Sequence, residues 1–94
     1  MEIDIFVVDE TEAVAIEVKS HLTQEVIDEY LETLSLFKQA FPAYKNYHIY
    51  GAVAGIEINE GVDRYGYKKG LFVIRQSGET VEIANDDQFQ PAVW

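Results

Sequence analysis

MEIDIFVVDETEAVAIEVKSHL, residues 1–22, is the stretch of the sequence that decides the fold. Apolar residues alternate with their neighbours on both sides of a polar segment at residues 9–12. This period of two predicts one strand over residues 1–8 and a second over residues 13–19. Because the polar segment is short, we expect the two strands to form an antiparallel hairpin.

The register of this hairpin sorts its side chains into two faces. One face carries the expected cross-strand pairs Val8–Ala13, Phe6–Ala15, Asp4–Glu17 and Glu2–Lys19. The other face carries only Val and Ile, namely Ile3, Ile5, Val7, Val14, Ile16 and Val18. A slip of one residue would mix the two faces, so this uniformity favours the register.

The rest of the chain alternates between helix and strand patterns. A helix is predicted over residues 23–41, with Thr23 as its N-cap and Pro42 as its stop. The remaining expected elements are a strand within 47–58, a helix over 60–69, a strand over 71–74, a strand over 80–83 and a docked tail carrying Phe89 and Trp94. Strand–helix–strand connections imply parallel pairs, so the sequence predicts a single α/β domain, residues 1–94, with a mixed sheet in the order ββαβαβ(β).

Composition narrows the classes of function. The 94 residues include 17 acids and 7 bases, for a net charge of −10, and no cysteine. Disulfides and cysteine-ligated zinc are therefore excluded. No apolar run approaches the ~20 residues of a membrane span, so we expect no membrane association and a cytoplasmic location. The negative net charge repels nucleic acid at long range. A nucleic acid could therefore bind only through a local basic patch.

Asp4 and Glu17 form the one pattern that suggests chemistry. Like charges directly opposite each other destabilise a strand pair, and such violations are expected at functional sites. Two carboxylates at this separation suit Mg²⁺, which proteins hold through one or two carboxylates plus phosphate oxygens. Lys19 projects from the same face and can stabilise charge on a phosphoryl group. The alternative is a solvated face with weak cross-strand ion pairs.

These residues also resemble a known signature. Glu2-Ile3-Asp4, a hairpin and Ile16-Glu17-Val18-Lys19 resemble the motif of the PD-(D/E)XK nuclease superfamily, in an uncharacterised bacterial branch that often carries the domain at the C-terminal end of a longer chain. The resemblance implies a restriction-endonuclease-like fold. It also implies that Asp4, Glu17 and the carbonyl of Val18 bind Mg²⁺ or Mn²⁺, and that Lys19 assists the attacking water. Further contacts to substrate are expected from Ser20, His21, Gln24 and Arg75.

One feature departs from the superfamily. Its core usually opens with a helix, and none is predicted before Glu2. We therefore expect the chain to be a piece of a longer protein or to be completed by a neighbouring subunit. Either a homodimer or an upstream helical segment would cover the apolar residues Phe6, Val8, Ala13 and Ala15.

Three functions follow from the sequence. The first is metal-dependent phosphodiester hydrolysis, with DNA preferred to RNA as the substrate. The second is a non-catalytic nuclease-like scaffold that acts as a dimerisation or protein-interaction module. The third is an acidic globular domain without a site.

Overall fold

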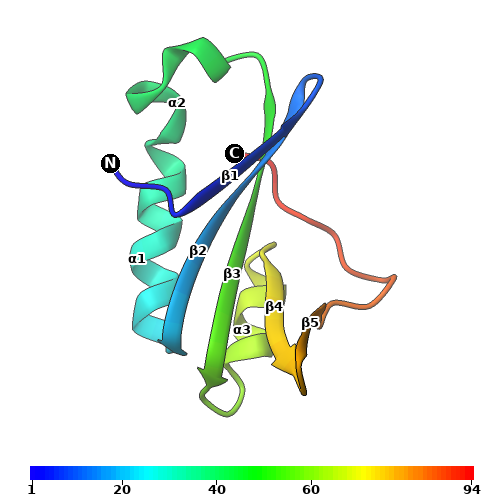
Figure 1. Cartoon of the computed structure of the whole chain (residues 1–94). Coiled ribbons are helices and arrows are strands. Elements are labelled where there is room, and N and C mark those ends of the chain that lie inside the picture. The colour runs from blue at the N-terminus through cyan, green and yellow to red at the C-terminus, as the bar shows by residue number, and fades with distance from the viewer.

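A computed structural model describes residues 1–94 as one mixed five-stranded sheet with its helices on one face (Figure 1). The strands lie in chain order: β1 (Ile5–Asp9), β2 (Glu12–Leu22), β3 (His48–Ile58), β4 (Phe72–Ser77) and β5 (Thr80–Ile83). The three central strands are parallel, and β1 and β5 are antiparallel edges. The mixed α/β class and the predicted order of elements are confirmed.

Two helices connect the parallel strands. Helix α1 (Gln24–Ser35) leads from β2 to β3, and α3 (Val62–Lys68) leads from β3 to β4. Because parallel crossovers are right-handed and both steps run in the same direction across the sheet, the two helices lie on the same face (Figure 1). No helix is both long enough and apolar enough to cross a membrane.

The first helix is shorter than predicted. Thr23 is its N-cap, with the hydroxyl accepting from the Val26 amide at 3.2 Å, as expected. The helix nevertheless ends at Ser35 and is followed by the short α2 (Phe37–Ala40) and the 3₁₀ helix η1 (Pro42–Tyr44). A single helix over residues 23–41 is therefore wrong. The break at Leu36, where φ is −103° and ψ is 0°, turns Phe37 into the core.

The helix-covered face of the sheet is the one that carries Phe6, Ala13 and Ala15. Ala13 and Ala15 are 2 % and 0 % exposed, and the Phe6 ring stacks on Phe37 with centroids 5.3 Å apart. The expectation that another subunit or segment covers these residues is wrong, because α1 and α2 of the same chain already do so. Val8, at the turn end, stays 43 % exposed.

Small residues on this face let α1 lie close to the sheet. Gly51 stands opposite Ala15 in the parallel register of β2 and β3. A Cβ atom on Gly51 would lie 2.6 Å from Leu34 Cδ1 and 2.7 Å from Leu71 Cδ2, which is closer than van der Waals contact allows. The close approach of the helix therefore depends on glycine at this position.

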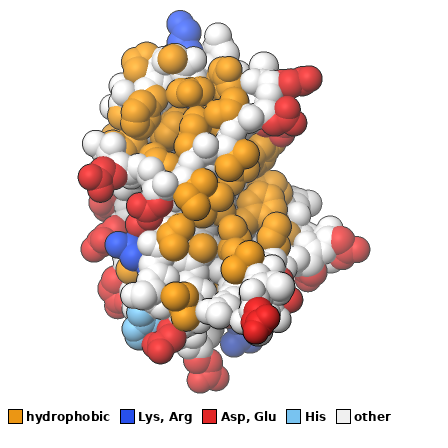
Figure 2. Space-filling model, viewed as in Figure 1, with side chains coloured by type: hydrophobic (Ala, Val, Ile, Leu, Met, Phe, Trp, Pro, Cys, Tyr) orange, Lys and Arg blue, Asp and Glu red, His pale blue; other side chains and the backbone are white.

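The opposite face of the sheet has no helix over it. It carries the Val and Ile side chains of β1 and of β2 up to Val18, and Ile5, Val7 and Val18 are about half exposed. Ile3, which the sequence predicts on this face, precedes β1 and packs against the core instead. Figure 2 looks onto this face and shows a band of hydrophobic side chains down its middle, with acidic side chains mostly along its borders. The hairpin register is confirmed in the pairs Val8–Ala13 and Phe6–Ala15, and the aliphatic side of the hairpin faces outward. The first strand begins only at Ile5, so the predicted pairs Asp4–Glu17 and Glu2–Lys19 lie beyond the end of the ladder.

The tail after β5 returns along the sheet, as predicted (Figure 1). The Ala92 amide donates to Gly70 O at 3.0 Å, and the Trp94 amide donates to Ile49 O at 2.8 Å. The Phe89 ring contacts Phe72, with the ring centroids 4.9 Å apart. The tail thus supplies one hydrogen bond, from Trp94, to the part of β3 that β4 does not reach.

Candidate metal and phosphodiester site

The hairpin brings Asp4, Glu17 and Lys19 together where β1 separates from β2. The ladder ends at the pair Ile5–Ile16, so the next amide of β2 on that edge loses its strand partner. The Asp4 carboxylate takes that place and accepts from the Val18 amide at 2.9 Å. Lys19 Nζ lies 3.6 Å from Glu17 Oε1. The predicted site residues on the hairpin therefore form one cluster.

Glu17 is the electrostatically strained member of the cluster. Its side chain is 20 % exposed, whereas that of Lys19 is 47 % exposed. Burial raises the pKa of Glu17 above its ordinary value of 4.5, and repulsion from Asp4 raises it further, while Lys19 acts in the opposite direction. The two carboxylates thus repel each other at neutral pH, and a cation placed between them would relieve that repulsion.

A small pocket lies beside Glu17 on the helix side. It has a volume of about 90 Å³ and is lined by Glu17, Lys19, Val26, Glu29, Tyr30 and Thr33. A water molecule occupies about 30 Å³ of liquid, so the pocket has room for an ion with part of its hydration shell. The α1 residues Glu29 and Thr33 were not among the predicted site residues. Their spacing of four residues places them on one side of the helix, next to the apolar stripe that faces β2.

Tyr30 forms the floor of this pocket. Its hydroxyl donates to the carbonyl of Ala15. Burial raises the pKa of Tyr30 above its ordinary value of 10.0, and the negative charge of Glu17 raises it further. Tyr30 therefore stays protonated at neutral pH and contributes a fixed donor that ties α1 to β2.

The other predicted contact residues do not line the pocket. Ser20 is exposed near the end of β2, and His21 Nε2 hydrogen-bonds Asn59 Oδ1 just beyond the C-terminal end of the neighbouring strand β3. Gln24 faces a separate groove beside α3. Arg75 pairs with Glu82, with Nε 2.8 Å from Oε1. The β2–β3–β4 register places Arg75 in line with Lys19, with a glycine between them.

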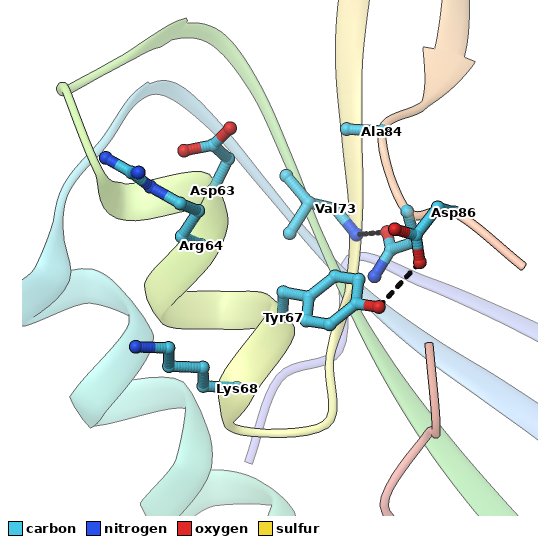
Figure 3. Close-up of a pocket in the computed structure, with 8 residues that line it drawn as sticks. Asp63, Arg64, Tyr67, Lys68, Val73, Ala84 and Asp86 are labelled. Carbon is cyan, nitrogen blue, oxygen red and sulfur yellow. Dashed lines mark hydrogen bonds between the residues drawn. The ribbon is translucent and has the colours of Figure 1, made fainter. Parts of the chain in front are cut away.

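A larger pocket of about 420 Å³ lies between α3 and the end of β5 (Figure 3). The Tyr67 hydroxyl donates to the Asp86 carboxylate at 2.5 Å, while Arg64 and Lys68 point away from that pair (Figure 3). Asp63 also lines the pocket, so the charges there are mixed. This arrangement does not form a concentrated basic surface for phosphate.

The donor set suits a hard divalent ion held in part by water. No group of three or more His, Cys, Asp or Glu side chains is close enough to form a protein-only metal cage. Mg²⁺ does not need one, because it is commonly bound by one or two carboxylates together with waters and substrate phosphates. Asp4, Glu17 and the Val18 carbonyl fit that mode, with one Asp4 oxygen engaged by the Val18 amide.

Comparison with known proteins gives no relative for this chain: no protein-family model, no curated protein and no solved structure matches it. The PD-(D/E)XK resemblance accordingly stays a prediction based on the hairpin residues and the order of elements.

Proposed function

We propose that this domain is a metal-dependent phosphodiesterase of the PD-(D/E)XK type, acting on DNA in preference to RNA. The observation that supports the proposal is the convergence of two carboxylates and an ammonium group at the end of the β1–β2 hairpin. Asp4, Glu17 and the Val18 carbonyl are the proposed ligands of Mg²⁺ or Mn²⁺.

A divalent ion at this position would acidify a bound water and polarise a phosphoryl oxygen. Asp4 is oriented for this role by the Val18 amide, which fixes one carboxylate oxygen and leaves the other free. Glu17 is held by Lys19 from one side, so its carboxylate keeps a defined direction. Lys19, being half exposed, can donate to the attacking water or to the negative charge that develops on phosphate.

Substrate contacts are proposed for residues farther along the same strands. Ser20 and His21 follow Lys19 on β2, and Arg75 lies in line with Lys19 two strands away. Because the chain carries a net charge of −10, the substrate must be held at short range by these residues and by the bound ion. We therefore expect weak metal binding without substrate and weak DNA binding without metal.

A titration with Mn²⁺, followed by amide NMR, tests the metal site. We expect selective paramagnetic broadening at Asp4, Glu17 and Val18 in the wild-type chain and its loss in Glu17→Gln. Asp9→Asn is the matched control, because it removes one acid of the same hairpin at the opposite end of β1. Diffuse broadening over many acids that Glu17→Gln leaves unchanged would contradict the proposal.

Hydrolysis of a labelled DNA duplex tests the chemistry separately from metal binding. Lys19→Met should lower the cleavage rate about 10²-fold or more while Mn²⁺ broadening persists, because it removes a group that acts on the reacting atoms and not a metal ligand. Equal rates for wild type and Lys19→Met would remove Lys19 from the mechanism.

A second candidate function is the non-catalytic scaffold. The hydrogen bond from the Val18 amide to Asp4 and the ion pair of Glu17 with Lys19 favour it, because both are local contacts that stabilise the hairpin without a ligand. In that case Mn²⁺ causes no selective broadening at the hairpin, and the replacement of Glu17 changes only the free energy of unfolding.

A further inference from the structure

The open face of the sheet is largely apolar on all five strands. The register aligns its side chains into rows that cross the sheet: Val7–Val14–Tyr50, Ile5–Ile16–Ala52–Phe72, Val18–Ala54–Ile74–Ile83 and Gln76–Val81. None of these rows contains an Asp, Glu, Lys or Arg residue. A row with charge, Asp9–Glu12–His48, begins only at the turn end of the hairpin.

Part of this face lies in the open, whereas Ala52 is buried and the Phe72 ring contacts Phe89 of the tail. Val7, Ile56, Val81 and Ile83 are between 53 % and 71 % exposed. The largest contiguous apolar patch on a typical monomeric protein covers about 300–600 Å² and is often functional, and larger patches mark interaction sites. The band of hydrophobic side chains in Figure 2 is such a patch, with its acidic side chains mostly at the border.

The size of the face fits an association between two copies. The strands contain 5, 11, 11, 6 and 4 residues. With about 3.3 Å per residue and about 4.8 Å between strands, the whole face, its charged turn end included, measures about 600 Å². Two such faces would bury about 1,200 Å² in total, which is the lower end of the range for specific protein interfaces.

The chemistry of the face also favours a second copy over a charged partner. The face offers no cation for a phosphate or an acidic peptide. Along these rows an identical sheet brings only uncharged side chains to the contact, apolar except for Gln76 and the hydroxyl of Tyr50, so neither partner has to desolvate a charge. Two sheets packed face to face make a β-sandwich core about 10 Å thick, for which alternating Val and Ile are well suited.

From these observations we infer that the chain forms a two-fold symmetric dimer through the open face of its sheet. The contact is isologous, so the same exposed Val and Ile residues are buried in both copies. Buried area alone does not set the affinity, so the dissociation constant is left to the measurement. The dimer does not involve Asp4, Glu17 or Lys19, so its presence is independent of the proposed hydrolysis.

Sedimentation velocity of the wild-type chain between about 1 µM and 1 mM is the direct test. We expect the mass to rise from 10.7 kDa to twice that value with concentration. A constant mass of 10.7 kDa over the whole range would overturn the inference and leave the face to a different partner. This measurement needs no variant, so it is decisive even if a substitution prevents folding.

Val7→Lys and Val8→Lys are a matched pair for locating the contact. Both residues are exposed and adjacent on β1, but Val7 points to the open face and Val8 to the helix-covered face. Val7→Lys should weaken dimerisation at least tenfold, and Val8→Lys should leave it unchanged. Equal effects of the two variants, with folding confirmed by circular dichroism, would place the contact elsewhere.

Discussion

Asp4→Asn separates the two interactions of the Asp4 carboxylate. An asparagine oxygen can still accept the hydrogen bond that the Val18 amide donates to Asp4 Oδ2 at 2.9 Å. The substitution removes the negative charge that repels Glu17 and raises its pKa. We expect Asp4→Asn to be more stable than the wild type at neutral pH in the absence of metal.

The magnitude follows from the separation of opposed side chains. Two unit charges about 4–5 Å apart interact by about 1 kcal/mol in water, and because Asp4 is exposed, screening by solvent and salt makes this an upper bound. For a domain of this size, about 1 kcal/mol corresponds to a melting-temperature increase of about 4–8 °C. Asparagine keeps a hydrogen bond to the Val18 amide, but a neutral acceptor makes it weaker than the carboxylate does, so part of this gain is offset.

The gain depends on pH in a defined direction. Because the folded-state pKa of Glu17 is raised above 4.5, the ionised carboxylate costs stability at a pH above its folded pKa and costs nothing below 4.5. Thermal unfolding followed by circular dichroism should therefore show the increase at pH 7 and no difference at pH 3. NMR titration should show the pKa of Glu17 falling toward 4.5 in the variant.

Two comparisons make the test strict. Asp4→Ala also removes the charge but leaves the Val18 amide without its acceptor, so it should be less stable than Asp4→Asn by about 1 kcal/mol. If Asp4→Asn were instead less stable than the wild type at pH 7, the carboxylate would be a stabilising ion-pair partner, and the argument from repulsion would fail. Saturating Mn²⁺ should raise the melting temperature of the wild type only.

Three further substitutions test the packing that supports the site. Gly51→Ala should destabilise the fold by about 1–3 kcal/mol in urea unfolding, because the new methyl group would lie 2.6 Å from Leu34 Cδ1; an unchanged midpoint would mean that α1 can shift away. Asn85→Ala should cost about 1–3 kcal/mol and speed hydrogen exchange at the Val73 amide, which donates to Asn85 Oδ1 at 2.7 Å; unchanged exchange would contradict this. Tyr30→Phe should reduce the loss of stability on raising the pH through 10, because a Tyr pKa raised above 10.0 makes ionisation unfavourable to the folded state; identical alkaline unfolding of both proteins would count against it.

The hairpin shows how far the sequence predicts the fold. Alternation on both sides of the turn predicts the pairing of Val8 with Ala13 and of Phe6 with Ala15, and the structure has these pairs. The same alternation does not say which face the helices cover. β-Branched residues favour strands whether or not they are buried. A strand face made of Val and Ile is therefore not necessarily the face that the helices cover. The better signal is the small size of Ala15 and Gly51, which lets α1 approach the sheet.

The candidate site was predictable to a similar degree. Residue spacing on β1 and β2 predicts that Asp4, Glu17 and Lys19 share a face, and the structure brings them together. Residue spacing does not predict that the Val18 amide donates a hydrogen bond to Asp4, because this contact depends on where β1 separates from β2. The contribution of Glu29 depends on how α1 docks, which is set by packing between segments far apart in the sequence.

The position of Trp94 in the docked tail makes its intrinsic fluorescence a probe of whether the tail is bound to the sheet. Trp94 is the only tryptophan in the sequence, and its indole nitrogen is buried without a hydrogen-bond partner. The ring packs against the residues of the core, while its amide is bonded to β3. Its fluorescence therefore reports whether the last residues remain packed on the core. Far-ultraviolet circular dichroism reports whether the sheet and helices remain folded. If the emission maximum shifts before the ellipticity changes, the tail leaves the sheet as a separate unit; if the two signals coincide, the tail unfolds together with the rest of the domain.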